Sequence, residues 1–571
     1  MLRAAVTSLT LASVLLASTG CQLLAGIEER KASHGAAGSG GSAGAAGAAG
    51  EAGQGGGAGS GGHAGSAGSG SAGDSGGSGA AGSAGAAGSA GAAGSAGAAG
   101  AAGSAGSGGL CSPNCPVYVN PAALAGGDGT SWASAMNDLQ QAVDQQWSAG
   151  GGEVWVQRGT FTAANSTPML RMRAGVQIRG GFEGTEGSLA ERPALVGGGY
   201  AGPALTASSP ITVLNGADVA TSVVVAGSNA TLDRFVVTHG SNPSGNYTGG
   251  GGISAVDVTG AQFIDVLLEV NASAQDGGAV YSKHSSLHFV RGTLRGNSAP
   301  NGAGIYALNG GSLDLDGTQF IDNTGAHGAA IYLTPTYSPA APSVELTAHG
   351  ALFAGNETNA GDSSASNGNL YLIEATASFD SVELVDNFCS LCTTGVYASD
   401  STVTFTNSLA ALNRGFGAAV TAGGSTNLTV LHSTFAFNDG NGCPQHCDVL
   451  GNGGTPFVNS ISAMLSKMGS SGLSGVQTTG SCSLFISGGL GSVATPFAST
   501  SIDRDGNGVV DYLLEQPGAN PCLDVGSASE DTARGYDWSS MTTSGSNCLD
   551  AVQPDAGRHY APTVASPVAC Q

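Results

Sequence analysis

Six segments of the chain carry the same order of apolar and polar positions, and each ends at an asparagine. These residues are Asn297, Asn323, Asn356, Asn387, Asn413 and Asn438, separated by 26, 33, 31, 26 and 25 residues. Such a period is typical of one coil of a β-solenoid, with insertions in the two longer intervals. An asparagine at a coil corner tolerates left-handed backbone angles and can hydrogen-bond to neighbouring backbone groups.

Apolar residues keep fixed distances from these asparagines. Three residues before them lie Leu294, Phe320, Phe353, Leu384, Ala410 and Phe435. Eight before lie Phe289, Leu315, Ala348, Phe379, Phe405 and Val430, and ten before lie Leu287, Leu313, Leu346, Ala377, Val403 and Leu428. Positions eight and ten before share one strand face, so each column stacks on itself at roughly 4.8 Å per coil. We therefore predict an all-β fold, a right-handed parallel β-helix over residues 117–500.

A second recurring element ends in tyrosine. Small residues precede Val280, Ile305, Ile331, Leu370 and Val396, which favours a tight turn before each strand. If these aliphatic side chains point inward, alternation sends the next residues outward: Tyr281, Tyr306, Tyr332, Tyr371 and Tyr397. We interpret this row as a ligand-binding surface for sugar rings. The alternative is structural, because stacked aromatic side chains stabilise a sheet by themselves.

The solenoid needs a cap at its first coil, and the sequence offers one. A strand is predicted at Val117–Asn120, followed by a helix over about Ala133–Trp147. Its apolar face is formed by Trp132, Met136, Leu139 and Val143. Strands are predicted again at Val154–Val156 and Leu170–Phe182. A helix between the first strands can cover the open apolar end of a solenoid.

The outward strand positions bring together one group of titratable residues. They are His288, Asp314, Asp316, His349 and Asp380. Neighbours two apart on a strand lie roughly 7 Å apart, within the range for two carboxylates that invert a glycosidic bond. Arg291 is the one nearby candidate for the base of a lyase. We favour the simpler interpretation, a solvated polar face without catalysis, and keep these residues as a catalytic alternative only.

The repeats resemble those of a known family. The run Gly277 to Val280 (GGAV) and the FxxN forms ending at Asn323, Asn356 and Asn438 resemble the paired repeats of the chlamydial polymorphic outer-membrane proteins. Asp128–Trp132, Gly180–Phe182 and Pro521–Gly526 extend the resemblance to the start and end of the folded part. It implies an adhesin or another displayed surface protein. Pectate lyases and polygalacturonases share the expected fold, so a polysaccharide lyase or glycoside hydrolase is the alternative.

The chain begins like an exported protein. Residues 1–21 hold Arg3, an apolar run from Ala4 to Ala17, and small residues before Cys21. Gly20-Cys21 resembles the lipobox of bacterial lipoproteins, which implies that Cys21 is acylated and anchors the mature chain to a membrane. Gln22 after it implies sorting to the outer membrane. An ordinary signal peptide with a chance cysteine is the alternative.

Residues 22–110 are rich in Gly, Ala and Ser and predict no packed domain. Glycine occupies every third position from Gly35 to Gly68, and again, in a new phase, from Gly73 to Gly109. Without proline this period favours a disordered, solvated spacer over a collagen-like helix, with a packed polyproline-II-like bundle as the alternative.

The acidic composition limits the classes of molecule that the chain can bind. The chain has 98 glycines, and its 17 basic and 40 acidic residues give a formal charge of −23. Nucleic acid would be repelled and is excluded as a partner. A polysaccharide or cell-surface glycan is expected, with the membrane reached through the lipid anchor alone.

The cysteines of the chain are expected to form disulfides. Apart from Cys21 there are ten cysteines, including the close pairs Cys111/Cys115, Cys389/Cys392 and Cys443/Cys447, and disulfides are favoured over zinc beside His446.

Residues 501–571 are predicted to form a C-terminal cap. It contains a DxDxNG pattern that could bind a structural Ca²⁺ through Asp503, Asp505, Asn507, Val509 and Asp511. Leu514 replaces the usual last carboxylate, and a plain acidic turn is the alternative. No other cofactor is expected.

Overall fold

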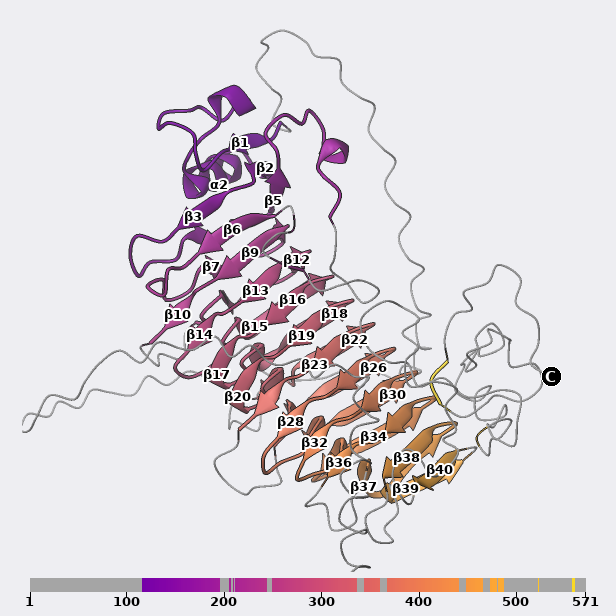
Figure 1. Ribbon diagram of the computed structural model, residues 1–571. Coiled ribbons are helices and arrows are strands. Elements are labelled where there is room, and N and C mark those ends of the chain that lie inside the picture. The colour runs from indigo at the N-terminus through magenta and orange to yellow at the C-terminus, as the bar shows by residue number, and fades with distance from the viewer. Residues whose placement is uncertain are drawn as a thin grey trace, which may run out of the picture. The chain divides into compact units, whose positions relative to one another are not determined.

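The computed structural model describes residues 115–195, 205–206, 209, 211–243, 249–335, 343–359, 367–440, 448–465, 473–479, 481–486, 522 and 557–559. These residues form a right-handed parallel β-helix, which confirms the predicted fold class (Figure 1). The predicted signal (1–21), the spacer (22–110) and the candidate calcium loop lie outside the described residues. Among the described residues, no helix has the length and apolar character needed to cross a bilayer.

Three parallel sheets run along the helix and are named here A, B and C. In the described part of the chain, sheet A consists of β1 (Val117–Val119), β2 (Gly152–Gln157), β4 (Leu170–Arg171), β5 (Val176–Phe182), β7 (Val224–Val225), β8 (Thr231–Asp233), β11 (Ile253–Val256), β12 (Ala261–Ile264), β15 (Val280–Val290), β18 (Ile305–Asp316), β21 (Ile331–Thr334), β22 (Glu345–His349), β25 (Leu370–Ile373), β26 (Thr376–Asp380), β29 (Val396–Ser399), β30 (Thr402–Thr406), β33 (Val420–Gly423), β34 (Asn427–Leu431), β37 (Val449–Val458) and β39 (Leu473–Thr479).

Sheet B consists of β3 (Thr160–Thr162), β6 (Thr212–Asn215), β9 (Phe235–Thr238), β13 (Leu267–Glu269), β16 (Thr293–Arg295), β19 (Gln319–Ile321), β23 (Leu352–Ala354), β27 (Glu383–Val385), β31 (Leu409–Ala411), β35 (Thr434–Ala436), β38 (Ile461–Leu465) and β40 (Cys482–Ile486). Sheet C consists of β10 (Ser241–Asn242), β14 (Ala272–Ser273), β17 (Ser298–Asn301), β20 (Thr324–His327), β24 (Glu357–Thr358), β28 (Phe388–Cys389), β32 (Arg414–Gly415) and β36 (Asp439–Gly440).

Each coil passes through sheet A twice. A first segment carries the tyrosine and a second carries the two apolar positions eight and ten residues before the asparagine. In β18 the two segments are continuous but bent, because Asn309, Gly310 and Gly311 have positive φ values of 62°, 84° and 89°. In the following coils the segments are separate strands, such as β25 and β26. Sheet A therefore presents two strips of outward side chains on either side of a bend.

The apolar columns predicted from the period form the core. Phe289 pairs with Leu315, and Leu315 pairs with Ala348, one coil at a time. Where phenylalanines meet, their rings stack, as in Phe379 and Phe405 with centroids 4.7 Å apart. All eighteen predicted column residues are buried. The register on which the fold prediction depends is thus confirmed.

The asparagines form a buried ladder. The backbone N–H and the Nδ2 of Asn356 both donate to Oδ1 of Asn387, each at 3.0 Å, and Nδ2 also donates to the carbonyl of Phe320. The same contacts repeat from Asn271, which the sequence analysis did not include, to Asn438. Every amide therefore bridges three coils through its own backbone and side-chain groups.

One detail of the corner prediction is wrong. The ladder asparagines do not have positive φ; the residue before each one does. These residues are Val270, Gly296, Asp322, Gly355, Asp386, Leu412 and Phe437. The asparagine contributes its amide, and its predecessor makes the turn.

The N-terminal cap is shorter than predicted. The α-helix, α2, spans Leu139–Ser148 and begins at Asp138, whose carboxylate accepts a hydrogen bond from the N–H of Gln141. The preceding residues form a 3-10 turn, η1 (Trp132–Ser134), and a bridge between Met136 and Val119. Leu139, Ala142 and Val143 of α2 are buried against the first strands, so the predicted capping role is confirmed (Figure 1). The predicted strand at 170–182 is divided into β4 and β5, and a further short 3-10 turn, η2, spans Leu189–Glu191.

The outward face of sheet B is covered. The outward residues four before each asparagine are all at most 3 % exposed: Leu267, Thr293, Gln319, Leu352, Glu383, Leu409 and Thr434. At the first coils, Leu205 packs on Leu267 and donates its N–H to Oγ1 of Thr293. At later coils, Arg558 donates to the buried carboxylate of Glu383, and its N–H donates to Oγ1 of Thr434. Sheet B is therefore an internal surface of this chain.

Candidate functional site

Sheet A carries long strands with an exposed outward face. We call the outward residues of its first segments the tyrosine strip: Tyr306, Tyr332, Tyr371 and Tyr397, with Leu308, Thr334, Ile373 and Ser399 two residues later. Backbone pairing places the four tyrosines directly above one another on successive coils. All eight side chains are half-buried. The strip is regularly spaced because strand pairing fixes the backbone of each tyrosine against the next coil.

Tyr281 belongs to the same column but does not share its exposure. It pairs with Tyr306, yet it is 1 % exposed. Burial, and then the charge of Asp276, raise the pKa of Tyr281 to about 12. Tyr281 shares the outward column predicted for it, with its ring 5.9 Å from that of Tyr306, but the ring is covered there and is not accessible.

The tyrosine rings contact one another along the column. Their centroids are 5.3 Å apart between Tyr306 and Tyr332, 4.7 Å between Tyr332 and Tyr371, and 5.5 Å between Tyr371 and Tyr397. Distances of this size are those of interacting aromatic pairs. The ring planes are inclined to one another, by 87° between Tyr306 and Tyr332, 36° between Tyr332 and Tyr371 and 50° between Tyr371 and Tyr397. The strip offers ring edges and phenol groups, in place of the open stacking platform that the sequence suggested.

His327, at the end of β20, was missed by the sequence analysis. Its ring lies 6.5 Å from that of Tyr332 and 6.2 Å from that of Tyr371. Nδ2 of Asn367 donates to Nδ1 of His327 at 2.8 Å and to the carbonyl of Ala326 at 2.7 Å. Because Nδ1 accepts, the neutral ring carries its proton on Nε2. His327 lies outside the repeat columns, so no periodic pattern could point to it.

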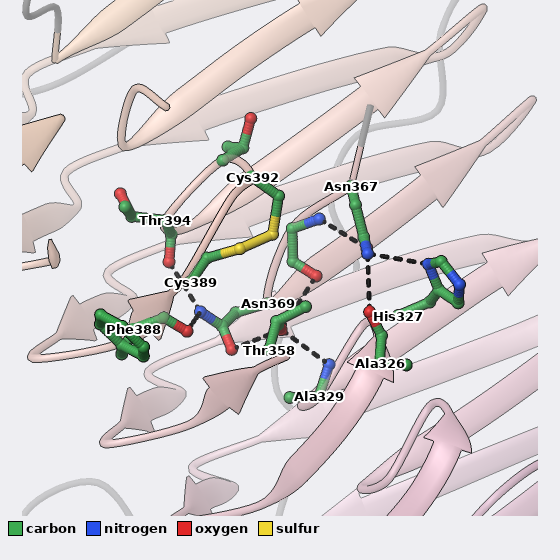
Figure 2. Close-up of a disulfide and its surroundings, with 12 residues drawn as sticks. Ala326, His327, Ala329, Thr358, Asn367, Asn369, Phe388, Cys389, Cys392 and Thr394 are labelled. Carbon is green, nitrogen blue, oxygen red and sulfur yellow. Dashed lines mark hydrogen bonds between the residues drawn. A yellow bond between two sulfur atoms is a disulfide. The ribbon is translucent and has the colours of Figure 1, made fainter. Parts of the chain in front are cut away.

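A disulfide fixes the corner next to the strip. Figure 2 shows a disulfide between Cys389 and Cys392, one of the close cysteine pairs in the sequence, and both residues are fully buried. Beside it, Nδ2 of Asn369 donates to the carbonyls of Phe388 and Thr394, at 3.1 and 2.8 Å. Asn369 directly precedes β25, and Thr394 lies two residues before β29. These bonds hold the strand starts that carry Tyr371 and Tyr397.

The five polar residues singled out as a catalytic alternative lie together on the second segments of sheet A. His288 pairs with Asp314, Asp316 with His349, and His349 with Asp380, on four successive coils. We call this group the aspartate–histidine patch. Nδ1 of His349 lies 3.1 Å from Oδ2 of Asp380, and Nε2 of His288 lies 3.5 Å from Oδ2 of Asp314.

The patch is a set of exposed ion pairs. Hydrogen bonding to Asp380, followed by the charges of Asp380, Asp316 and Asp314, raises the pKa of His349 despite the opposing effect of burial. The side chains of His349 and Asp380 remain 63 % and 49 % exposed. Such pairs keep a sheet surface polar, and they contribute little to stability.

Arg291 is not available as the base of a lyase. Its Nε and Nη2 each donate to one carboxylate oxygen of Asp265, both at 2.8 Å. This hydrogen bonding raises the pKa of Arg291, so the guanidinium keeps its proton. The residue is an ion-pair partner that fixes the turn between sheets A and B.

The remaining predicted sites receive no structural test. Cys21 and the candidate calcium ligands Asp503, Asp505, Asn507, Val509 and Asp511 lie outside the described residues, as do Cys111, Cys443 and Cys447. Within the described ranges, no three His, Cys, Asp or Glu side chains are grouped so that they could hold a metal ion. A second disulfide joins Cys482 to Cys522, a pairing that sequence spacing did not indicate.

Comparisons with known proteins give a general likeness. No protein-family model matches the chain, and no curated protein matches it. Among solved structures it is similar to a pectate lyase, with 12 % identity, a TM-score of 0.33 and coverage of 72 % of this chain and 92 % of that one. It is also similar to a rhamnogalacturonan lyase, with 15 % identity, a TM-score of 0.30 and coverage of 73 % and 98 %.

A third similar structure is a tailspike protein of an Acinetobacter baumannii bacteriophage, a capsular polysaccharide depolymerase. It has 12 % identity, a TM-score of 0.26 and coverage of 63 % of this chain and 60 % of that one. The parallel β-helix of the present chain is established by its own strand pairings.

Proposed function

We propose that this chain is a non-catalytic, surface-displayed β-helix protein that binds polysaccharide through the tyrosine strip of sheet A. The observation that carries the proposal is the half-exposed row of Tyr306, Tyr332, Tyr371 and Tyr397, held in register over four coils. Phenol groups and ring edges suit a sugar polymer, whose surface also alternates hydroxyl groups and apolar C–H groups.

The contrast between the sheets supports this choice of surface. Sheet B is covered by the chain itself, and most strands of sheet C are only two residues long. Sheet A combines strand length, regular spacing and exposure. A rigid surface of this kind loses little conformational entropy when it binds an extended polymer.

Display at the cell surface is part of the same proposal. The supporting features are the lipobox-like Gly20-Cys21, the Gly/Ala/Ser-rich residues 22–110, and repeats that resemble the chlamydial polymorphic outer-membrane proteins. Cys21 would carry the lipid in the outer membrane, and the spacer would separate the β-helix from that membrane. In this arrangement the protein serves adhesion to glycan-bearing surfaces.

A polysaccharide lyase or glycoside hydrolase is the second candidate. The observation in its favour is the pair of His349 and Asp380, because an imidazole with a raised pKa beside several carboxylates can transfer protons. The exposure of the patch and the fixed proton of Arg291 speak against it.

The experiment uses the full chain and a panel of neutral and acidic polysaccharides. Retention is measured by affinity electrophoresis, and reducing ends and unsaturated products are assayed in the same samples. We expect retention without new products. Replacing both Tyr332 and Tyr371 by alanine should abolish retention, whereas replacing both by phenylalanine, which keeps the ring contacts, should weaken it less.

Two further variants act as controls. Replacing both Thr402 and Thr404 by alanine alters outward positions of sheet A away from the strip and should leave retention unchanged. Product formation that disappears in Asp314→Asn and His349→Gln would establish the enzymatic alternative instead.

A further inference from the structure

The tyrosine strip has a defined length. At one end of the column Tyr281 is buried, and at the other end Tyr397 pairs with Thr421, which is also buried. Four accessible tyrosines remain between these limits, on the four successive strands β18, β21, β25 and β29. A ligand that follows the column can therefore meet four phenol side chains.

The spacing of the row fits a sugar polymer that lies along the helix axis. The three ring separations, 5.3, 4.7 and 5.5 Å, follow the stacking of the coils. Each is close to the length of one pyranose in an extended linear chain. A polymer lying across the strands would then advance by one sugar per coil and would meet rings of different tilt, because neighbouring ring planes are inclined by 87°, 36° and 50°.

The strip carries no charge over these four coils. Its second column contains Leu308, Thr334, Ile373 and Ser399. The carboxylates of the aspartate–histidine patch lie on the other segments of sheet A, and the whole chain has a formal charge of −23. A polyuronate would be repelled by this surrounding charge, whereas a neutral polymer would not.

Gly423 explains how the row ends. It lies in β33, and a Cβ atom at this position would be 2.7 Å from the phenol oxygen of Tyr397. Tyr397 therefore lies over the glycine of the next coil. Any larger residue at position 423 would displace the last ring of the row. A substitution of Gly423 therefore tests the position of Tyr397 without changing the tyrosine itself.

We infer that the strip is a four-subsite binding site for a neutral, linear polysaccharide, with one sugar unit on each coil from Tyr306 to Tyr397. This inference rests on the proposed function and specifies its ligand class and its length.

The test uses the full chain and neutral oligosaccharides of two to eight units, prepared from β-1,4-linked glucose and from β-1,4-linked N-acetylglucosamine. Oligogalacturonate of the same lengths is the charged comparison. Dissociation constants are measured by calorimetry. We expect affinity for a neutral series to rise up to four units and then to level off, with oligogalacturonate binding more weakly at every length.

Variants locate the subsites. Tyr397→Ala should shift the plateau from four units to three and weaken binding of the tetramer roughly three- to tenfold, the usual range for one aromatic contact. Gly423→Ala should do the same by moving the ring. Tyr281→Phe, at the buried end, should leave the length dependence unchanged.

The outcomes separate the two proposals. If polysaccharides are retained but the affinity has no plateau at four units, or Tyr397→Ala leaves the plateau in place, the four-subsite inference is wrong and binding stands. Tighter binding of oligogalacturonate would overturn the neutral class. If no sugar in either experiment binds, the proposed function itself fails.

Discussion

Nδ2 of Asn438 donates a hydrogen bond to Oδ1 of Asp448 at 2.9 Å, and the asparagine ladder ends at this contact. The other carboxylate oxygen of Asp448 accepts from the hydroxyl of Ser462 at 2.7 Å. Asp448 is fully buried, and this burial raises its pKa to about 7 against the opposing effect of the two hydrogen bonds. A ladder of neutral amides thus terminates in a group that can ionise.

This arrangement predicts a pH-dependent stability. The folded protein holds a proton on Asp448 that the unfolded chain releases near pH 4, so stability should fall as pH rises from about 4 to about 7. The loss should be on the order of a few kcal/mol. Asp448→Asn should remove this dependence and stabilise the protein at pH 8. Thermal unfolding of both proteins between pH 4 and pH 8 measures the difference, and parallel curves would contradict the prediction.

A second prediction concerns the middle of the ladder. Asn356→Ala removes the acceptor of two donors on Asn323 and the donor to the Phe320 carbonyl, all of them buried. Each buried group left without a partner costs about 1–3 kcal/mol. We expect a loss of several kcal/mol in the free energy of unfolding, measured by denaturant titration. Asn427→Ala, at the exposed start of β34, is the matched control and should change little.

A third prediction follows from the backbone. Val270 has a φ of 55° and is 51 % exposed, although a β-branched residue fits the left-handed region poorly. Asp322 and Asp386 stand at the same corner of later coils. Val270→Asn should therefore raise stability by about 1 kcal/mol. Val256→Asn, at an exposed strand position, should not, and an equal effect at both sites would rule out the backbone explanation.

A fourth prediction tests the cover of sheet B. Glu383 is fully buried and accepts a hydrogen bond from Arg558. Arg558→Ala removes the guanidinium from this buried carboxylate, and breaking a buried ion pair typically costs about 3–5 kcal/mol. Hydrogen exchange should accelerate in β27, β31 and β35 and remain unchanged in β15 and β18. Adding Glu383→Gln to Arg558→Ala should recover part of the loss, and no recovery would show that charge is not the cause.

A fifth prediction concerns the patch. Asp380 raises the pKa of His349, so the ring keeps its proton to higher pH and the ion pair is lost when the pH rises above the pKa of the histidine. Asp380→Asn should lower the pKa of His349, which NMR titration of the ring protons measures directly. A pKa of His349 that is the same in Asp380→Asn as in the unchanged protein would contradict the prediction.

The repeat is the reason that the fold could be predicted from the sequence. Columns such as Phe289, Leu315 and Ala348 recur at fixed distances from the asparagines, and stacking parallel strands translates that recurrence directly into contact. Asn271 fits the same pattern, with Leu268 three residues before it and Phe263 eight before it, and could have been included. The fold and the two outward columns of sheet A follow from the period.

The features that the repeat pattern did not predict depend on residues outside the repeated positions. The hydrogen bond from Arg558 to Glu383 joins residues 175 positions apart, and the approach of His327 to Tyr371 joins neighbouring coils through residues that do not repeat. Outward residues of sheet B, such as Leu352 and Leu409, carried a signal: apolar side chains at positions that alternation sends outward imply a covering segment. Exposure cannot be deduced from alternation when another part of the chain lies on the strand.

The contacts of Gly557, Arg558 and His559 also bear on the order of assembly. They join Asn459, Thr434, Glu383 and Asn407, which lie about 100 to 175 residues earlier in the chain. During synthesis these coils are complete long before residues 557–559 emerge. Until then the hydrogen bonds to Thr434, Glu383 and Asn407 cannot form, and a chain interrupted before Gly557 would never form them.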